Sequence, residues 1–136
     1  MTSAPSAAAA PIADLEQVRF DRALIELQIS DPAARVALDS DTGLAVGVDG
    51  EIRVSMPSAA RALPETDRSA AAAVLFLDMH GALFGINGWH DLDPQYASPI
   101  GNSIWFTFEA KTQRGTLLVN VCAEDDTVRH VRIERS

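Results

Sequence analysis

Residues 104–108 alternate between two faces of a strand and two more apolar runs follow by 133, and this pattern constrains the fold more than any other feature of the sequence. Ile104, Phe106 and Phe108 would form one face of a strand, and Trp105 would lie on the other. Two further apolar runs follow, separated by an acidic turn, so we predict antiparallel strands here. Because both faces of the first strand are apolar at its centre, Trp105 either packs under a helix or remains exposed as an anchor for a partner, and we favour packing under a helix.

The 136 residues match the size of one domain, and 47% of them are hydrophobic, which is enough to form a core. Residues 1–11 are small and polar, with a proline on each side of an alanine run, so we predict a flexible tail. Neither an internal repeat nor a second linker is evident in the sequence. We therefore expect 12–136 to form a single α+β domain.

The chain is acidic, with 19 Asp and Glu against 11 Lys and Arg and a formal net charge of −8. This charge opposes binding to nucleic acids and to anionic membranes, and it favours a basic protein as partner. The single cysteine, Cys122, excludes an intramolecular disulfide and is expected to be buried. No apolar run reaches the roughly 18–20 residues of a membrane helix, and no signal peptide is evident, so we expect a cytoplasmic protein.

The first half of the chain predicts a helix followed by a meander. The apolar spacing over 12–29 fits one helical face, although its last five residues also alternate as a strand would. Residues 35–56 are typical of three antiparallel strands with two turns. The first turn is the polar segment 39–43, and the second is Asp49-Gly50, which favours a type I′ hairpin because both turn residues need positive φ.

Residues 64–86 allow two interpretations. Pro64-Glu65 and the alanine-rich stretch after them favour a buried helix that reaches about His80. The alternative is a hairpin over 74–86, and periodicity does not separate the two for so short an apolar run. We favour the helix. The next segment, 87–103, contains many Gly, Pro and Asn residues, and we predict a loop.

No motif makes a convincing catalytic or metal site. Asp41-Thr42-Gly43 matches the tripeptide of retroviral-type aspartic proteases, but it also fits the turn between the first two strands. His90 precedes two aspartates, yet zinc sites normally show closer pairs of ligands. We therefore expect a protein without catalytic residues, metal or cofactor, which acts by binding another protein.

The candidate partner-binding residues are Trp105, Trp89, Asp91 and Asp93. Apolar anchors surrounded by polar groups carry most of the energy of protein interfaces, and acidic groups would steer a basic partner. We expect Trp105 to lie near the acidic loop of Asp91 and Asp93. If Trp105 is instead a core residue that packs under a helix, it does not belong to the site.

The order of helix, meander and buried helix over residues 20–85 resembles the class I chaperones of type III secretion. These are small, acidic, cytoplasmic homodimers that hold a segment of a secreted partner partly unfolded, so the resemblance implies that function and a homodimer. The family ends in a helix, whereas 116–134 here are typical of strands.

Two alternatives to the secretion chaperone remain. Residues 74–78 and 84–88 resemble paired strands of the flavin-binding split-barrel proteins related to pyridoxamine-phosphate oxidase, which implies a bound flavin and requires the hairpin over 74–86. Basic residues that would hold the flavin phosphate are scarce in that region. The other alternative is an acidic immunity protein that blocks a basic toxin, which fits the size and the charge.

Overall fold

The computed structural model describes residues 14–111 and 115–135. The predicted tail at 1–11 lies outside these residues. In chain order the elements are α2 (Leu15–Ser30), β1 (Arg35–Leu38), β2 (Ala45–Ile52), α3 (Ser58–Arg61), α4 (Glu65–His80), the 3-10 helices η1 (Gly81–Phe84) and η2 (Trp89–Asp91), β3 (Leu92–Ile100), β4 (Ser103–Ala110), β5 (Gly115–Cys122) and β6 (Val128–Arg135). Across these described ranges, no helix is long and apolar enough to span a membrane.

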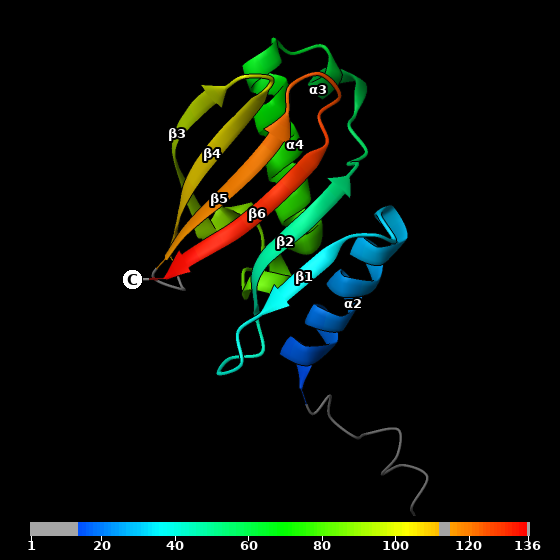
Figure 1. Ribbon diagram of the computed structural model, residues 1–136, viewed down its shortest axis with the longest axis vertical. Helices are drawn as coiled ribbons and strands as arrows, with labels where there is room; N and C mark the ends of the chain where they lie inside the picture. The colour runs from blue at the N-terminus through cyan, green and yellow to red at the C-terminus, as the bar shows by residue number, and fades with distance from the viewer. Residues whose placement is uncertain (1–13, 112–114, 136) are drawn as a thin grey trace, which may run out of the picture.

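The six strands form one antiparallel sheet in the order β1-β2-β6-β5-β4-β3. Helix α4 crosses one face of this sheet and lies behind the strands in Figure 1. Helix α2 packs against α4 and η1 at the β1 end of the molecule. This arrangement of helices and antiparallel strands confirms the predicted α+β class.

The core lies between α4 and the sheet. Phe106 pairs with Val119, and Val119 pairs with Val131, so one side chain from each of three neighbouring strands points at the helix. Helix α4 contributes Phe76 and Leu77, and all five side chains are buried. Each such side chain stabilises the fold by about 1.5–3 kcal/mol when it leaves water. The predicted strands of the C-terminal third are confirmed.

Helix α4 confirms the helical interpretation of 64–80, and the alternative hairpin over 74–86 is wrong. Its buried residues Ala73, Phe76, Leu77 and His80 follow the i, i+3, i+4, i+7 spacing of one helical face. The 3-10 helix η1 continues the chain until Gly85, whose φ of +78° ends it. The paired strands required by the resemblance to flavin-binding split barrels therefore do not form in 74–86.

The predicted hairpin turn at Asp49-Gly50 is wrong, because β2 runs through both residues and pairs with β6 instead of with a third meander strand. Gly50 faces the connection between α2 and β1. A Cβ atom on it would lie 2.6 Å from Asp31 Oδ2 and 3.2 Å from Ala34 Cα. Asp31 Oδ2 also accepts a hydrogen bond from Glu51 N at 2.8 Å. Glycine therefore serves a close approach of two segments here and not a turn.

Strand β3 lies within the segment that the sequence predicted as a loop. Pro94 and Pro99 carry no N–H to donate, which argues against a central strand but is tolerated at an edge. Strand β3 is the last strand of the sheet and pairs only with β4, with an irregularity between Pro94 and Tyr96. The loop prediction is wrong because prolines are excluded from the central strands of a sheet but are compatible with an edge strand.

Candidate functional site

The sheet face opposite α4 carries the predicted anchor Trp105, and we call it the open face because none of the described helices lies over β3–β6 on this side (Figure 1). Ile104 and Phe106 point into the core, so Trp105 between them points to the open face. The same alternation places side chains of all four strands on the open face. They are Tyr96, Ser98 and Ile100 of β3, Thr107 of β4, Leu118 and Asn120 of β5, and His130 and Arg132 of β6.

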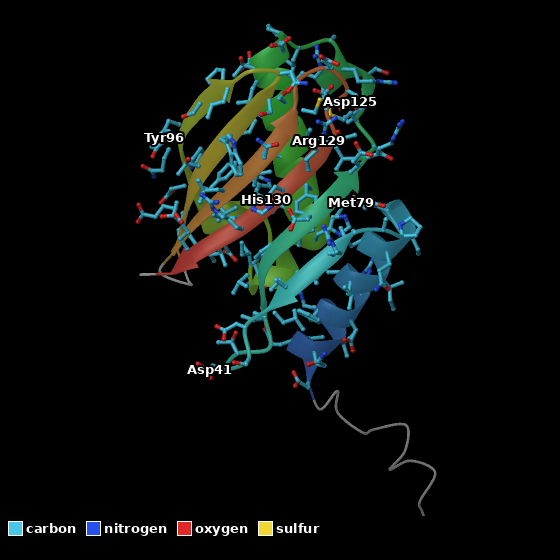
Figure 2. All side chains as sticks on the ribbon, viewed as in Figure 1. Asp41, Met79, Tyr96, Asp125, Arg129 and His130 are labelled. Atoms are coloured by element: carbon cyan, nitrogen blue, oxygen red, sulfur yellow. The ribbon has the colours of Figure 1, made fainter. Side chains whose placement is uncertain are left out.

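Trp105 is the centre of an apolar group on the open face, which we call the Trp105 cluster. Ser98 lies directly opposite Trp105 on β3, so Tyr96 and Ile100 are diagonal neighbours of the indole ring. Leu118 is the diagonal neighbour on β5. Tyr96 and Ile100 are 66% and 63% exposed, and Trp105 and Leu118 are half-buried. Figure 2 shows Tyr96 at the β3 edge of the molecule. These four side chains form the Trp105 cluster.

Two side chains of β6, Arg132 and His130, border the Trp105 cluster. The guanidinium of Arg132 lies 5.4 Å from the centre of the indole ring, within the range of a cation–π contact. The His130 ring meets the indole edge-on at 5.7 Å, and its Nδ1 contacts the carboxylate of Asp49. Figure 2 places His130 in the middle of the sheet. Strand neighbours, not a helix, half-bury Trp105, so the expectation that it packs under a helix is wrong.

The other predicted partner-binding residues lie in the 3-10 helix η2 and at the start of β3. Trp89 is 43% exposed and stacks on His90 with ring centres 4.3 Å apart. Asp91 Oδ2 accepts a hydrogen bond from Asn87 N at 2.8 Å, and the Asp93 carboxylate lies 3.4 Å from Lys111 Nζ. The structure therefore brings these three residues together. Each of them already interacts with a neighbouring residue of the chain, through a ring contact, a hydrogen bond or an ion pair.

Trp105 and the acidic loop are not adjacent. Asp93 pairs with Glu109, which lies four positions along β4 from Trp105. At about 3.3 Å of rise for each residue, this separation is about 13 Å. The predicted proximity of Trp105 to Asp91 and Asp93 is therefore wrong, and the side chains beside the indole ring are those of His130 and Arg132. The sequence offered no signal for these two, because they belong to a strand 25 residues further along the chain.

The histidines and aspartates considered for chemistry lie apart. His80 is fully buried, its Nδ1–H donates to Ala23 O at 3.3 Å, and burial lowers its pKa. His90 is exposed beside Trp89. Asp41 lies at the tip of the β1–β2 turn, where its N–H donates to Asp39 Oδ1 at 2.9 Å (Figure 2). Among the described residues, no group of three or more His, Cys, Asp or Glu side chains could hold a metal ion.

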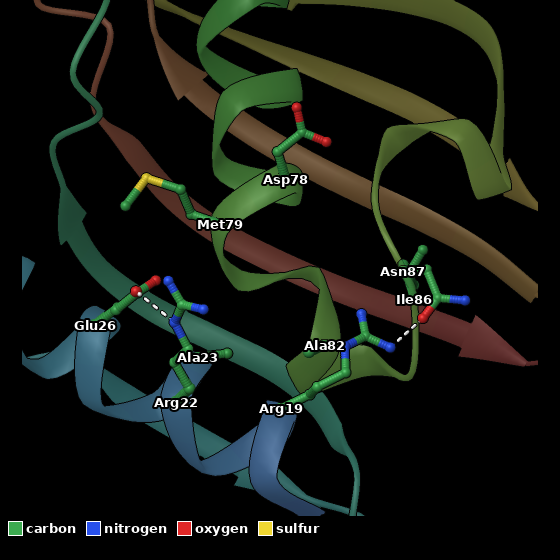
Figure 3. A pocket seen from close by; sticks show the side chains of 9 residues that line it. All are labelled: Arg19, Arg22, Ala23, Glu26, Asp78, Met79, Ala82, Ile86 and Asn87. Atoms are coloured by element: carbon green, nitrogen blue, oxygen red, sulfur yellow. Dashed lines mark hydrogen bonds and ion pairs between the residues drawn. The ribbon is translucent and has the colours of Figure 1, made fainter. Parts of the chain in front are cut away.

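A shallow pocket of about 400 Å³ lies between α2 and the end of α4 (Figure 3). Its charged groups already have partners. Arg22 Nε lies 3.1 Å from Glu26 Oε1, and the Arg19 guanidinium donates to the side-chain oxygen of Asn87. Asp78 Oδ1 accepts a hydrogen bond from a backbone N–H at 3.2 Å. Because these groups pair with one another or with neighbouring groups of the chain, the pocket carries no argument for a ligand.

Comparisons with protein-family models, with curated proteins and with solved structures find no match to this chain. The site is therefore interpreted from its own geometry.

Proposed function

We propose that this protein is a non-enzymatic binding domain whose open face holds an apolar segment of another protein. The Trp105 cluster is the observation that carries the proposal. The cluster combines two large side chains that are about two-thirds exposed with a half-buried tryptophan and a half-buried leucine. Arg132, beside the cluster, stacks on the tryptophan. Tryptophan, tyrosine and arginine are the residue types that most often dominate binding energy at protein interfaces.

The bound segment would lie across the open face and would not extend the sheet at an edge. Added strands need free N–H groups along an edge, and Pro94 and Pro99 remove two of these groups from β3. The other edge strand, β1, has only four residues. The Trp105 cluster therefore offers side-chain contacts, whereas both edges offer few backbone hydrogen bonds.

This mode of binding is consistent with a small acidic secretion chaperone in the cytoplasm, the function that the resemblance over residues 20–85 implies. The net charge of −8 favours a partner in which basic residues flank the apolar segment. The one cysteine of the chain, Cys122, is buried, so the fold rests on no disulfide, as is usual in a reducing compartment.

Site-specific photo-crosslinking tests this function. A photoreactive phenylalanine analogue at Tyr96, in cells that produce the protein, should give a discrete adduct with a second protein. The same analogue at Asp41, an exposed turn position outside the open face, is the matched control and should give none. If both positions gave the same adducts, or if Tyr96 gave none, the open face would not be the binding site.

A further inference from the structure

Helix α2 is apolar on two opposite faces, and only one of them packs on the rest of the molecule. The inner face carries Ala23 and Leu27, which are buried, with Phe20 and Leu24 packed against the core. The outer face carries Leu15, Val18, Ile25 and Ile29. These four side chains are 55%, 52%, 57% and 76% exposed. A helix with apolar residues on both sides normally has a partner on each side.

The spacing of the outer residues defines the kind of partner. Leu15, Val18, Ile25 and Ile29 occupy alternating three- and four-residue steps, with Arg22 at the position between Val18 and Ile25. Such steps form the seam of a helix that packs side by side on another helix. A flat surface or an extended peptide would not select this spacing. We call these four residues the outer stripe.

We propose that the outer stripe is a homodimer interface, in which α2 packs antiparallel on α2 of a second copy of this chain. The charges on the helix support a second copy in this orientation. If Val18 faces Ile29 of the second copy, Arg22 lies opposite Ile25 and beside Glu26 of that copy. Within one helix Arg22 Nε pairs with Glu26, and because the Arg22 side chain is 81% exposed, its guanidinium can also reach Glu26 of the second copy. A parallel arrangement would instead place the two Arg22 side chains opposite each other.

The size of the contact sets the strength of the dimer. A helix of 16 residues is about 24 Å long, so the pair would bury less than the roughly 1,200 Å² of a standard interface. We therefore expect a reversible dimer with a Kd on the order of micromolar. Because both copies use the same surface in a two-fold dimer, no outer stripe is left free for a third copy, and higher oligomers are not expected. The inference is argued from the outer stripe and not from the open face, and the resemblance to secretion chaperones also implies a homodimer.

Sedimentation velocity of the full chain over about 1–500 µM tests the inference. The wild type should change from monomer to dimer across this range. Ile25→Asp should raise the Kd at least tenfold, and Ile100→Asp, at a comparably exposed isoleucine on the open face, is the matched control and should leave it unchanged. Circular dichroism of both variants checks the fold.

A charge exchange tests the antiparallel register separately. Arg22→Glu alone should weaken the dimer, because it places two acids side by side at the seam, and the double variant with Glu26→Arg should restore it. A wild type that stays monomeric at every concentration would overturn the inference. So would a dimer that survives Ile25→Asp but not Ile100→Asp, or a monomer that dimerises only after deletion of residues 1–11, since that segment would then be the occupant.

Discussion

An ion pair between Arg68 and Asp126 ties α4 to the turn between β5 and β6. Arg68 Nε lies 2.7 Å from Asp126 Oδ2, and a second guanidinium nitrogen donates to Ala123 O at 3.2 Å. The hydroxyl of Ser69, which is fully buried, donates to Asp126 Oδ1 at 3.3 Å. Asp126 also has a positive φ of 59°, a conformation that costs most residues energy but that Asp and Asn tolerate. We expect this single aspartate to be a main contributor to stability.

Two effects set the magnitude for Asp126→Ala. Removing one partner costs about 3–5 kcal/mol for a buried pair and about 0–1 kcal/mol for an exposed pair. The two side chains are 24% and 17% exposed, which lies between the two cases, so we place this loss at about 2 kcal/mol. Alanine at positive φ adds about 1 kcal/mol, for a total of about 3 kcal/mol. Asp126→Asn keeps the backbone conformation and the Ser69 bond, so it should cost about 1 kcal/mol.

Urea denaturation followed by circular dichroism measures these differences, provided that the m-values agree. A double-mutant cycle with Arg68→Met isolates the charge interaction, and we expect a coupling energy of about 1 kcal/mol with Asp126→Asn. A loss below about 1 kcal/mol for Asp126→Ala, or a coupling energy of zero, would show that the pair does not hold α4 against the turn.

Three further predictions concern other parts of the molecule. Gly50→Ala should destabilise the fold by about 1–3 kcal/mol in thermal melts, because a Cβ atom collides with the α2–β1 connection, and Asp31→Ala should relieve only part of this loss. Since burial lowers the pKa of His80, the unfolded chain binds more protons as the pH falls below 6.5, so stability should fall between pH 7 and 5, and less in His80→Leu. Asp41→Asn should leave partner binding unchanged in a pull-down, because Asp41 lies in a turn outside the open face.

The sequence predicts those elements that bury one face, because their apolar residues then recur with the period of a helix or a strand. Helix α4 and the strands that contain Phe106 and Val119 follow from their own spacing, because each buries one face. At Gly50 and Pro94 the local pattern predicted the wrong element, because the roles of these residues depend on distant segments. A glycine beside Asp31 and a proline at the sheet edge have the same local pattern as residues of a turn or a loop.

The candidate site was predictable only in part. Alternation showed that Trp105 and Phe106 face opposite sides of a strand, but it did not show which side α4 covers. The contact of Trp105 with Arg132 depends on the sheet order, in which β5 separates β4 from β6. Sheet order is set by packing of the whole chain, so the sequence pointed to the acidic residue Asp91 as a neighbour of Trp105, whereas the structure places His130 and Arg132 beside the indole ring.

The most direct test of the open face as a binding site compares the two tryptophans. Once crosslinking at Tyr96 identifies a partner segment, its Kd is measured by isothermal titration with the wild type, Trp105→Ala and Trp89→Ala. We expect Trp105→Ala to raise the Kd about 30-fold, which corresponds to about 2 kcal/mol, with a small change in melting temperature. Trp89→Ala should leave the Kd within about twofold of the wild type. Equal effects of the two substitutions, or a Trp105→Ala variant that binds normally, would contradict the account.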